Sequence, residues 1–150
     1  MRIILMVGAS GSGKTTWISR EFPHASVCSS DDYFIGADGI YRFDARELGR
    51  AHAECLRNFI ELIQSDEDIE ELVVDNTNTS IAELSPYIAV SRAFGFEPEV
   101  FWMEESDVAK LTARNEHGVH AGAVRGMLRN MDRTRYDWPS FWPRPTVIRP

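Results

Sequence analysis

The sequence predicts an α/β fold, in which a mostly parallel sheet of four to five strands lies between layers of helices. Apolar runs of strand length recur at residues 3–7, 25–29, 72–74 and 100–103. Stretches with helical periodicity separate these runs, and such alternation is typical of a parallel sheet that helices cover on both faces. The chain has 150 residues, which is the length of one domain.

A phosphate-binding motif directly follows the first predicted strand. Residues 8–15 read GASGSGKT and match the Walker A pattern G-x-x-x-x-G-K-[ST]. Glycines let the backbone turn so that successive N–H groups point inward, and the next helix adds its positive N-terminal end. We expect a polyphosphate there, with Lys14 at the β- and γ-phosphates and Thr15 on Mg²⁺. The expected nucleotide-binding residues of the loop are Gly8, Ala9, Ser10, Gly11, Ser12, Gly13, Lys14, Thr15 and Thr16.

Composition and charge exclude several classes of protein. A hydrophobic fraction of 43% and a charged fraction of 26% are ordinary for a soluble globular chain. The net charge of -7 argues against a general nucleic-acid binder, although residues 114–150 are locally basic, with seven Arg against three acidic residues. Because lysine is nearly absent, most phosphate contacts would fall to Arg, whose planar fork suits that group.

The sequence also predicts where the protein acts. The first apolar run is too short for a signal peptide, and no later stretch approaches the roughly 20 apolar residues of a membrane span. We therefore expect a cytoplasmic location and no membrane partner; the oligomeric state stays open. Cys28 and Cys55 lack His or Cys neighbours at metal-ligand spacing and are expected to be buried free thiols.

Several helices are predicted after the second strand. Residues 44–64 place one apolar face inward. The members of that face are Leu48, His52, Cys55, Phe59 and Leu62. Ser80 and Glu83 have the spacing of a capping box, whereas Pro86 is typical of a second helix start, so one kinked helix and two helices both stay open. Gly95 is expected to end this segment.

The C-terminal third is predicted to hold two more helices and an arm. Ser106 is expected to cap a helix that runs to about residue 114. A last helix, residues 123–131, turns its apolar residues inward; these are Val124, Met127, Leu128 and Met131. Residues 136–150 are rich in Pro and Trp and are expected to form an extended arm of the same domain, in which residues 146–148 could add an edge strand.

Two adjacent carboxylates follow the second predicted strand. Ligands of open α/β sheets lie beyond the carboxyl ends of the strands, so Asp31 and Asp32 should face the phosphate loop. A carboxylate there can accept the proton of an acceptor hydroxyl, which is worth roughly 10²- to 10⁴-fold in rate. Adjacent residues of an extended chain point opposite ways. We assign Asp31 as the catalytic base, while Asp32 either shares the site or caps the next turn.

The third predicted strand ends in the polar sequence DNTN. An apolar strand that ends in Asp has the form of a Walker B element, so Asp75 is expected to bind Mg²⁺ directly or through water. The next polar residues, Asn76, Thr77 and Asn78, either orient substrate hydroxyls or cap the next helix.

Residues 111–120 combine a helix end, a Gly-bearing loop and a new helix, which is the pattern of a lid over ATP. Arg114 and a helix face with Arg125 and Arg129 could reach the transferring phosphoryl group, where one Arg can be worth 10³ to 10⁵ in rate. The alternative is a solvated basic face. His117 could donate to phosphate when protonated, or it is an ordinary surface residue.

In this order, GASGSGKTTW, SSDDYF, VVDNTN and LTARNEHGV resemble the kinase domain of phage-type polynucleotide kinases and related stand-alone ATP-binding domains. The resemblance covers residues 1–135. It implies a P-loop NTPase fold, a nucleoside-kinase-like three-layer sandwich with a helical lid. It further implies ATP-dependent phosphorylation of a nucleic-acid 5′-hydroxyl, with Lys14 and Thr15 at the phosphates, Asp31 as base and Arg114 in the lid.

Two positions depart from that family. Phage-type enzymes carry Arg directly after D-D-Y, where it is thought to grip a phosphate of the acceptor, and here the residue is Phe34. His117 stands in the place of a lid Arg. The aromatic residues Tyr33, Phe34, Tyr41 and Phe43 could stack on a base, at about 1 to 3 kcal/mol per base, or pack the loop onto the long helix.

The expected acceptor-side residues are Asp31, Tyr33, Phe34, Asn76, Asn78 and His117. Three rival functions stay open. The first is a kinase of nucleosides, sugars or other metabolites, which would need a closed acceptor pocket. The second is a kinase of hydroxymethyl groups on modified DNA bases. The third is an ATP-binding module without transfer activity.

Overall fold

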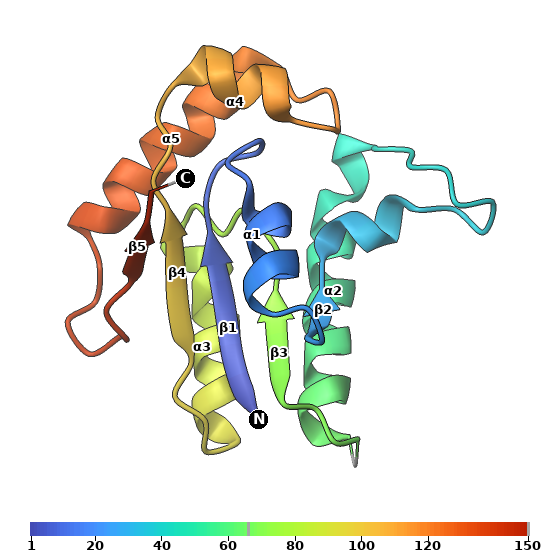
Figure 1. Cartoon of the computed structure of the whole chain (residues 1–150), viewed down its shortest axis with the longest axis vertical. Helices are drawn as coiled ribbons and strands as arrows, with labels where there is room; N and C mark the ends of the chain where they lie inside the picture. Colours follow the sequence, from blue (N-terminus) through green and yellow to red (C-terminus); the bar gives the residue numbers. More distant parts are fainter. Residues whose placement is uncertain (66, 150) are drawn as a thin grey trace.

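The computed structural model describes residues 1–65 and 67–149 and contains a five-stranded parallel sheet (Figure 1). The strand order is β2-β3-β1-β4-β5. The strands are β1 (Arg2–Val7), β2 (Ser26–Cys28), β3 (Glu71–Val74), β4 (Glu99–Met103) and β5 (Thr146–Ile148). Central strand β1 pairs Leu5 with Val74 on one side and Val100 on the other. Because helices cover both faces, residues Ile3 to Val7 are all buried.

Within the described residues, five α-helices and two short 3-10 helices surround the sheet. They are α1 (Lys14–Glu21), η1 (Ser30–Phe34), η2 (Ala45–Glu47), α2 (Leu48–Gln64), α3 (Ile81–Ala93), α4 (Val108–Arg114) and α5 (Ala121–Tyr136). Ile4 and Met6 pack with α1, whereas Ile3, Leu5 and Val7 belong to the core under α2 and α3. The structure is therefore a three-layer α/β sandwich, as predicted.

Helix α2 buries a face that differs in part from the predicted one. Cys55 and Phe59 are buried as expected, but Leu48 is 38% exposed. The buried stripe continues through Ala51 and Ile63 instead. This stripe follows a spacing of four residues, which matches one of the natural ridges of a helix surface.

Helix α3 is one helix, with Pro86 inside it. Its N-terminus carries the expected capping box, because the Ser80 hydroxyl accepts from the Glu83 N–H and the Glu83 carboxylate accepts from the Ser80 N–H. Gly95 follows the helix with a φ of 84°, in the left-handed region that glycine tolerates. The predicted end of this helix is therefore confirmed.

The prediction that Ser106 caps the next helix is wrong. The cap is Asp107, whose carboxylate accepts from the Lys110 N–H at 3.1 Å. Asp107 directly precedes the first helical residue, which places its side chain at the unpaired N–H groups of the first turn. Helix α5 is longer than residues 123–131 at both ends, and it buries Val124 and Met131 while Met127 and Leu128 are partly buried.

The C-terminal segment packs against the sheet. Strand β5 extends the sheet beyond β4, with Thr146 opposite Phe101, so the expected edge strand forms. The rings of Trp102 and Trp138 are 6.2 Å apart, and those of Trp138 and Trp142 are 5.3 Å apart, both edge to face. Across the described residues, none of the helices has both the length and the apolar character needed to cross a membrane.

Candidate active site

The Walker A residues form a tight loop between β1 and α1. Gly11 has a φ of 80°, and a Cβ added there would clash with the Leu111 carbonyl oxygen of the lid helix α4. A Cβ on Gly8 would lie 2.9 Å from the Met103 Cβ. Gly11 is therefore required both for its left-handed backbone and for the close approach of α4, whereas Gly8 is required only for the close approach of Met103.

Lys14 folds back over the loop. Its side chain is buried, and its ammonium donates to the carbonyl oxygens of Gly8 at 3.0 Å and Ala9 at 3.2 Å. Burial lowers the pKa of Lys14, while the charges of Asp75 and Asp31 act in the opposite direction. A bound polyphosphate would therefore bring negative charge to a desolvated cation.

Thr15 and Asp75 lie together beside the loop. The Thr15 hydroxyl donates to Asp75 Oδ2 at 2.7 Å. Burial raises the pKa of Asp75, and the Thr15 hydrogen bond and the Lys14 charge lower it. Mg²⁺ is usually held by one or two carboxylates together with phosphates and water. The Thr15 hydroxyl at the start of α1 and the Asp75 carboxylate after β3 fit that donor set.

Asp31 lies where the end of β2 meets the site. Its backbone N–H donates to the Ser29 hydroxyl at 3.2 Å, and that hydroxyl donates to the Asp75 carbonyl at 3.1 Å. The Tyr41 hydroxyl donates to Asp31 Oδ1 at 3.2 Å. The Asp31 side chain stays 48% exposed, so it is accessible to a hydroxyl from outside.

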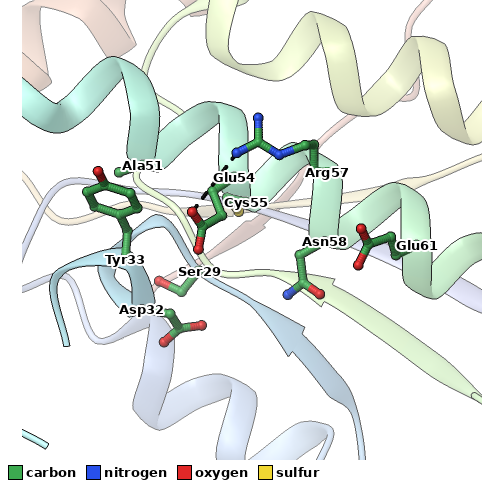
Figure 2. Close-up of a pocket in the computed structure, with 9 residues that line it drawn as sticks. All are labelled: Ser29, Asp32, Tyr33, Ala51, Glu54, Cys55, Arg57, Asn58 and Glu61. Carbon is green, nitrogen blue, oxygen red and sulfur yellow. Dashed lines mark ion pairs between the residues drawn. The ribbon is translucent and has the colours of Figure 1, made fainter. Parts of the chain in front are cut away.

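Asp32 lies at a cavity whose lining does not include Asp31. It lines a cavity of about 230 Å³ between η1 and α2. Figure 2 shows Ser29, Asp32 and Tyr33 on one side of this cavity and Glu54, Arg57, Asn58 and Glu61 of α2 on the other. Burial is the main reason why the pKa of Asp32 is raised. Three carboxylates and one guanidinium line the cavity, so it carries a net negative charge.

The Asn76 side chain stabilises the site by hydrogen bonds to several elements. The side chain is 3% exposed. Its Oδ1 accepts from the Ser30 N–H at 2.8 Å, and its Nδ2 donates to Cys55 Sγ at 3.4 Å and to the Tyr87 hydroxyl at 3.3 Å. One amide therefore ties the end of β3 to η1, α2 and α3. Of the two sequence hypotheses for Asn76, the helix cap is wrong because Ser80 caps α3, and the substrate contact stays a prediction beside this structural role.

Asn78 is likewise a structural residue. It is 1% exposed, has a φ of 45°, and donates from Nδ2 to the Met6 carbonyl at 2.9 Å. Asn tolerates the left-handed region better than most residues. Its expected role at the substrate stays a prediction, and the alternative of a helix cap is wrong because Ser80 caps α3.

For Phe34 the structure agrees with the packing alternative, and a role at the substrate stays a prediction. The ring is 5% exposed and packs against Tyr33, Tyr41 and Phe43, with centroids 5.1 to 6.0 Å apart. Tyr33 donates from its hydroxyl to Glu47 at 2.9 Å and also lines the η1–α2 cavity. Phe34 therefore stabilises the loop by packing against its aromatic neighbours, and Tyr33 is in addition exposed to the η1–α2 cavity.

Helices α4 and α5 arch over the phosphate loop, and the connection between them reaches the segment before α2 (Figure 1). The Ser10 N–H points at Met127 Sδ, 3.5 Å away. Asn115 shapes the connection, since its side chain accepts from the Val119 N–H and donates to the carbonyls of Thr112 and Val119. The Ser10–Met127 contact joins the lid to the phosphate loop, and the Asn115 hydrogen bonds fix the shape of the connection itself.

The lid arginines do not reach the loop in this arrangement. Arg114 is about half exposed and lies 4.0 Å from Glu105. Arg125 is exposed and lines a cavity of about 600 Å³ between α4 and α5, together with Asp107 and Thr112. His117, by contrast, contacts the Asp31 side of the site. Sequence reasoning assigned no role in the site to Met127, Asn115 or the Tyr41 hydroxyl, because only the fold brings them there.

Comparisons with known proteins identify the family of this chain. A family model described as an AAA domain matches residues 3–135. NEDD4-binding protein 2 from Homo sapiens is 31% identical over 139 residues, covering 87% of this chain and 8% of that protein. The chain thus spans only a small part of that relative.

Solved structures share the fold at low sequence identity. A chain in the structure of the Pnkp1/Rnl/Hen1 RNA repair complex has a TM-score of 0.72 at 16% identity, covering 92% of this chain and 46% of that one. A gluconokinase from Sinorhizobium meliloti 1021 has a TM-score of 0.59 at 15% identity, covering 99% of this chain and 82% of that one. These structures show that the fold is that of P-loop kinases. Because the family model covers most of the chain, the chain belongs to the AAA-domain family.

Proposed function

We propose that this protein transfers the γ-phosphoryl group of ATP to an alcohol, and that the alcohol is the 5′-hydroxyl of a nucleic acid. The observation that carries the proposal is the grouping of Lys14, Asp75 and Asp31. The negative charges of both carboxylates raise the pKa of the buried Lys14 ammonium against the effect of burial, and the Asp31 side chain stays partly exposed. A phosphate cradle and an accessible base therefore share one site.

Each residue has a separate task in this reaction. The loop amides and Lys14 hold the β- and γ-phosphates. Thr15 and Asp75 would hold Mg²⁺, which neutralises charge that develops on the phosphates. Asp31 accepts the proton of the acceptor hydroxyl while the oxygen of that hydroxyl bonds to the γ-phosphorus. The bond between the γ-phosphorus and the β,γ-bridging oxygen breaks, and ADP leaves. Arg114 would turn from Glu105 toward the transferring group.

Two lines support a nucleic-acid acceptor. The motif set resembles that of polynucleotide kinases, and the chain shares the fold of a chain in the Pnkp1/Rnl/Hen1 RNA repair complex, at a higher TM-score than with the gluconokinase. Asp31 also lies at the rim of the sheet under the lid and not at the bottom of a closed pocket. A strand end can approach such a position.

A small acceptor is the second candidate. The η1–α2 cavity is lined by Asp32, which directly follows Asp31 in the sequence, and by Glu54 and Glu61 of α2. These carboxylates would repel a polyanion and favour a polyhydroxyl or amine-bearing molecule. A metabolite kinase would use this cavity for its acceptor.

The deciding experiment is label transfer from γ-labelled ATP with Mg²⁺. The acceptors are 5′-hydroxyl DNA and RNA oligonucleotides, duplex DNA with a hydroxymethyl base, and a panel of sugars and nucleosides. We expect label on the 5′-hydroxyl oligonucleotides. Label only on a metabolite, or only on the modified duplex, would reject the 5′-hydroxyl assignment, and ATP binding without transfer to any acceptor would reject the activity.

Two adjacent carboxylates supply a matched control for the base. Asp31→Asn should keep ATP binding and lose transfer by roughly 10²- to 10⁴-fold, because its amide no longer accepts a proton. Asp32→Asn changes the same charge one residue away and should keep most of the activity. Lys14→Ala should lose ATP binding together with transfer. A near-normal rate for Asp31→Asn would show that the base is misassigned.

A further inference from the structure

The cations of this chain are unevenly neutralised. Most of its 16 Lys and Arg side chains lie within 4.0 Å of a carboxylate. Lys14 is an exception and donates to the carbonyls of the phosphate loop. Over the part of the chain that the structure describes, the cations that have neither kind of partner are Arg125, Arg129, Arg133 and Arg144.

Three of these cations form one stripe on α5. Arg125, Arg129 and Arg133 follow each other at four-residue spacing and are all exposed, so they share one side of the helix. We call them the basic stripe. Another side of the same helix carries Met127, which contacts the phosphate loop. Asp132 is also exposed on α5 and reduces the positive charge of the stripe without removing it.

The position of the stripe relates it to the candidate base. His117 lies 3.7 Å from Asp31, and α5 begins four residues later at Ala121. The stripe therefore starts at the lid end that meets Asp31 and runs away from it along α5 (Figure 1). Successive arginines are about 6 Å apart along the helix axis.

The charge of the remaining protein makes this stripe distinctive. With a net charge of -7, most of the surface repels a polyanion. Guanidinium groups without an internal carboxylate are free to form bidentate contacts with phosphates. A row of them along one helix suits a ligand with repeated phosphates better than one with a single anionic group.

We infer that the basic stripe binds the phosphodiester backbone of a nucleic-acid strand whose end lies at Asp31. This inference rests on the proposed function and deepens it, because it assigns the path of the strand beyond its reacting nucleotide. The contacts go to phosphates, so binding along the stripe is independent of base sequence. Each contact releases counterions from the strand, which makes the affinity depend on salt.

The test compares two double variants of equal charge change. Arg129→Gln/Arg133→Gln removes two members of the stripe and leaves Arg125 in place. Arg20→Gln/Arg46→Gln removes two exposed arginines, 72% and 88% exposed, from α1 and η2. Fluorescence anisotropy of a labelled 5′-hydroxyl single-stranded DNA is recorded from 50 to 200 mM salt. Melting temperatures of all variants confirm that they fold.

The expected result is a change in the salt dependence of the stripe variant alone. Single strands give a slope of log K against log[salt] of about -0.7 per neutralised phosphate, so the slope should become shallower by about 1.4. The control should keep the wild-type slope. An unchanged slope in the stripe variant, or an equal change in the control, overturns the inference.

Direct binding separates this inference from the proposed activity. If the wild-type protein shows stripe-dependent binding but transfers no label, the proposed activity fails and the stripe stands. If the wild-type protein labels 5′ ends but the stripe variant has the same salt dependence of binding as the wild type, only the inference fails. A wild-type protein that binds no oligonucleotide at any of these salt concentrations overturns the inference outright.

Discussion

His117 Nε2 lies 3.7 Å from Asp31 Oδ2, and the imidazole stacks on the Tyr41 ring with 4.2 Å between the centroids. The Tyr41 hydroxyl donates to the other oxygen of the same carboxylate. Side chains from the lid and from the loop before α2 thus contact both oxygens of the candidate base. The Asp31 side chain stays 48% exposed, so an acceptor hydroxyl would approach it beside His117.

We expect His117→Ala to open the lid more often. The lost ring stacking is worth about 1 kcal/mol, which corresponds to about fivefold in the opening equilibrium. Amide hydrogen exchange of residues 115–120, followed by mass spectrometry, should rise by that factor. Tyr41→Phe keeps the stacking and should leave the exchange of this segment near wild type. Unchanged exchange in His117→Ala would contradict a closing role for the contact.

Asn76→Ala should lower both stability and the transfer rate. The variant leaves the Ser30 N–H without its acceptor in a partly buried place, which costs about 1 kcal/mol. Urea unfolding measures that loss. Because Ser30 precedes Asp31, we expect kcat to fall more than the affinity for ATP. Asn58→Ala, at the exposed rim of the η1–α2 cavity, is the control and should stay within about 0.5 kcal/mol. A free energy of unfolding equal to that of the wild type in Asn76→Ala would refute the stabilising role of this side chain.

Gly11→Ala should damage the contact between the phosphate loop and the lid. A left-handed φ costs a residue with a Cβ roughly 1 to 2 kcal/mol. The clash with the Leu111 carbonyl adds to that cost, because backbone atoms of α4 must move. We expect a lower melting temperature and weaker ATP binding. Gly122→Ala has open space in α5 and should be neutral or stabilising, by up to about 1 kcal/mol. Equal effects of the two substitutions would contradict this account.

Cys28 gives a prediction about pH. Burial raises the pKa of its thiol from 9.0 to about 12, and the charges of Cys55 and Asp32 add to this. The folded state therefore holds this proton more tightly than the unfolded state does. Its contribution to stability is complete below pH 9 and is lost as the pH rises toward 12. Urea unfolding between pH 8 and 12 should show this decline, and Cys28→Ala should make it shallower.

Thiol labelling provides an independent check on the same residue. Cys28 and Cys55 are both free and buried, as the sequence predicts. A thiol reagent at pH 8 should label neither cysteine in the native protein and both after unfolding, because the reacting form is the thiolate. Rapid labelling of the native protein would show that the site opens more readily than its packing indicates.

Predictions that depend on neighbouring residues in the chain held best. The Ser80 capping box and the Gly95 helix end involve residues within a few positions of each other, and both are confirmed. The Ser106 cap failed by one position, since adjacent polar residues compete for the same N–H groups. The face of α2 failed in part because its contacts belong to distant strands.

By itself, the sequence determined the parallel α/β sheet, the phosphate loop and the place of Asp31 at a strand end, since contiguous residues encode each of them. Only the tertiary structure decided that Asn76, Asn78 and Phe34 are enclosed, and that His117 reaches Asp31. Burial depends on which loops lie over a strand end, and those loops come from parts of the chain tens of residues away. No local pattern carries that information, because packing sums contacts across the whole fold.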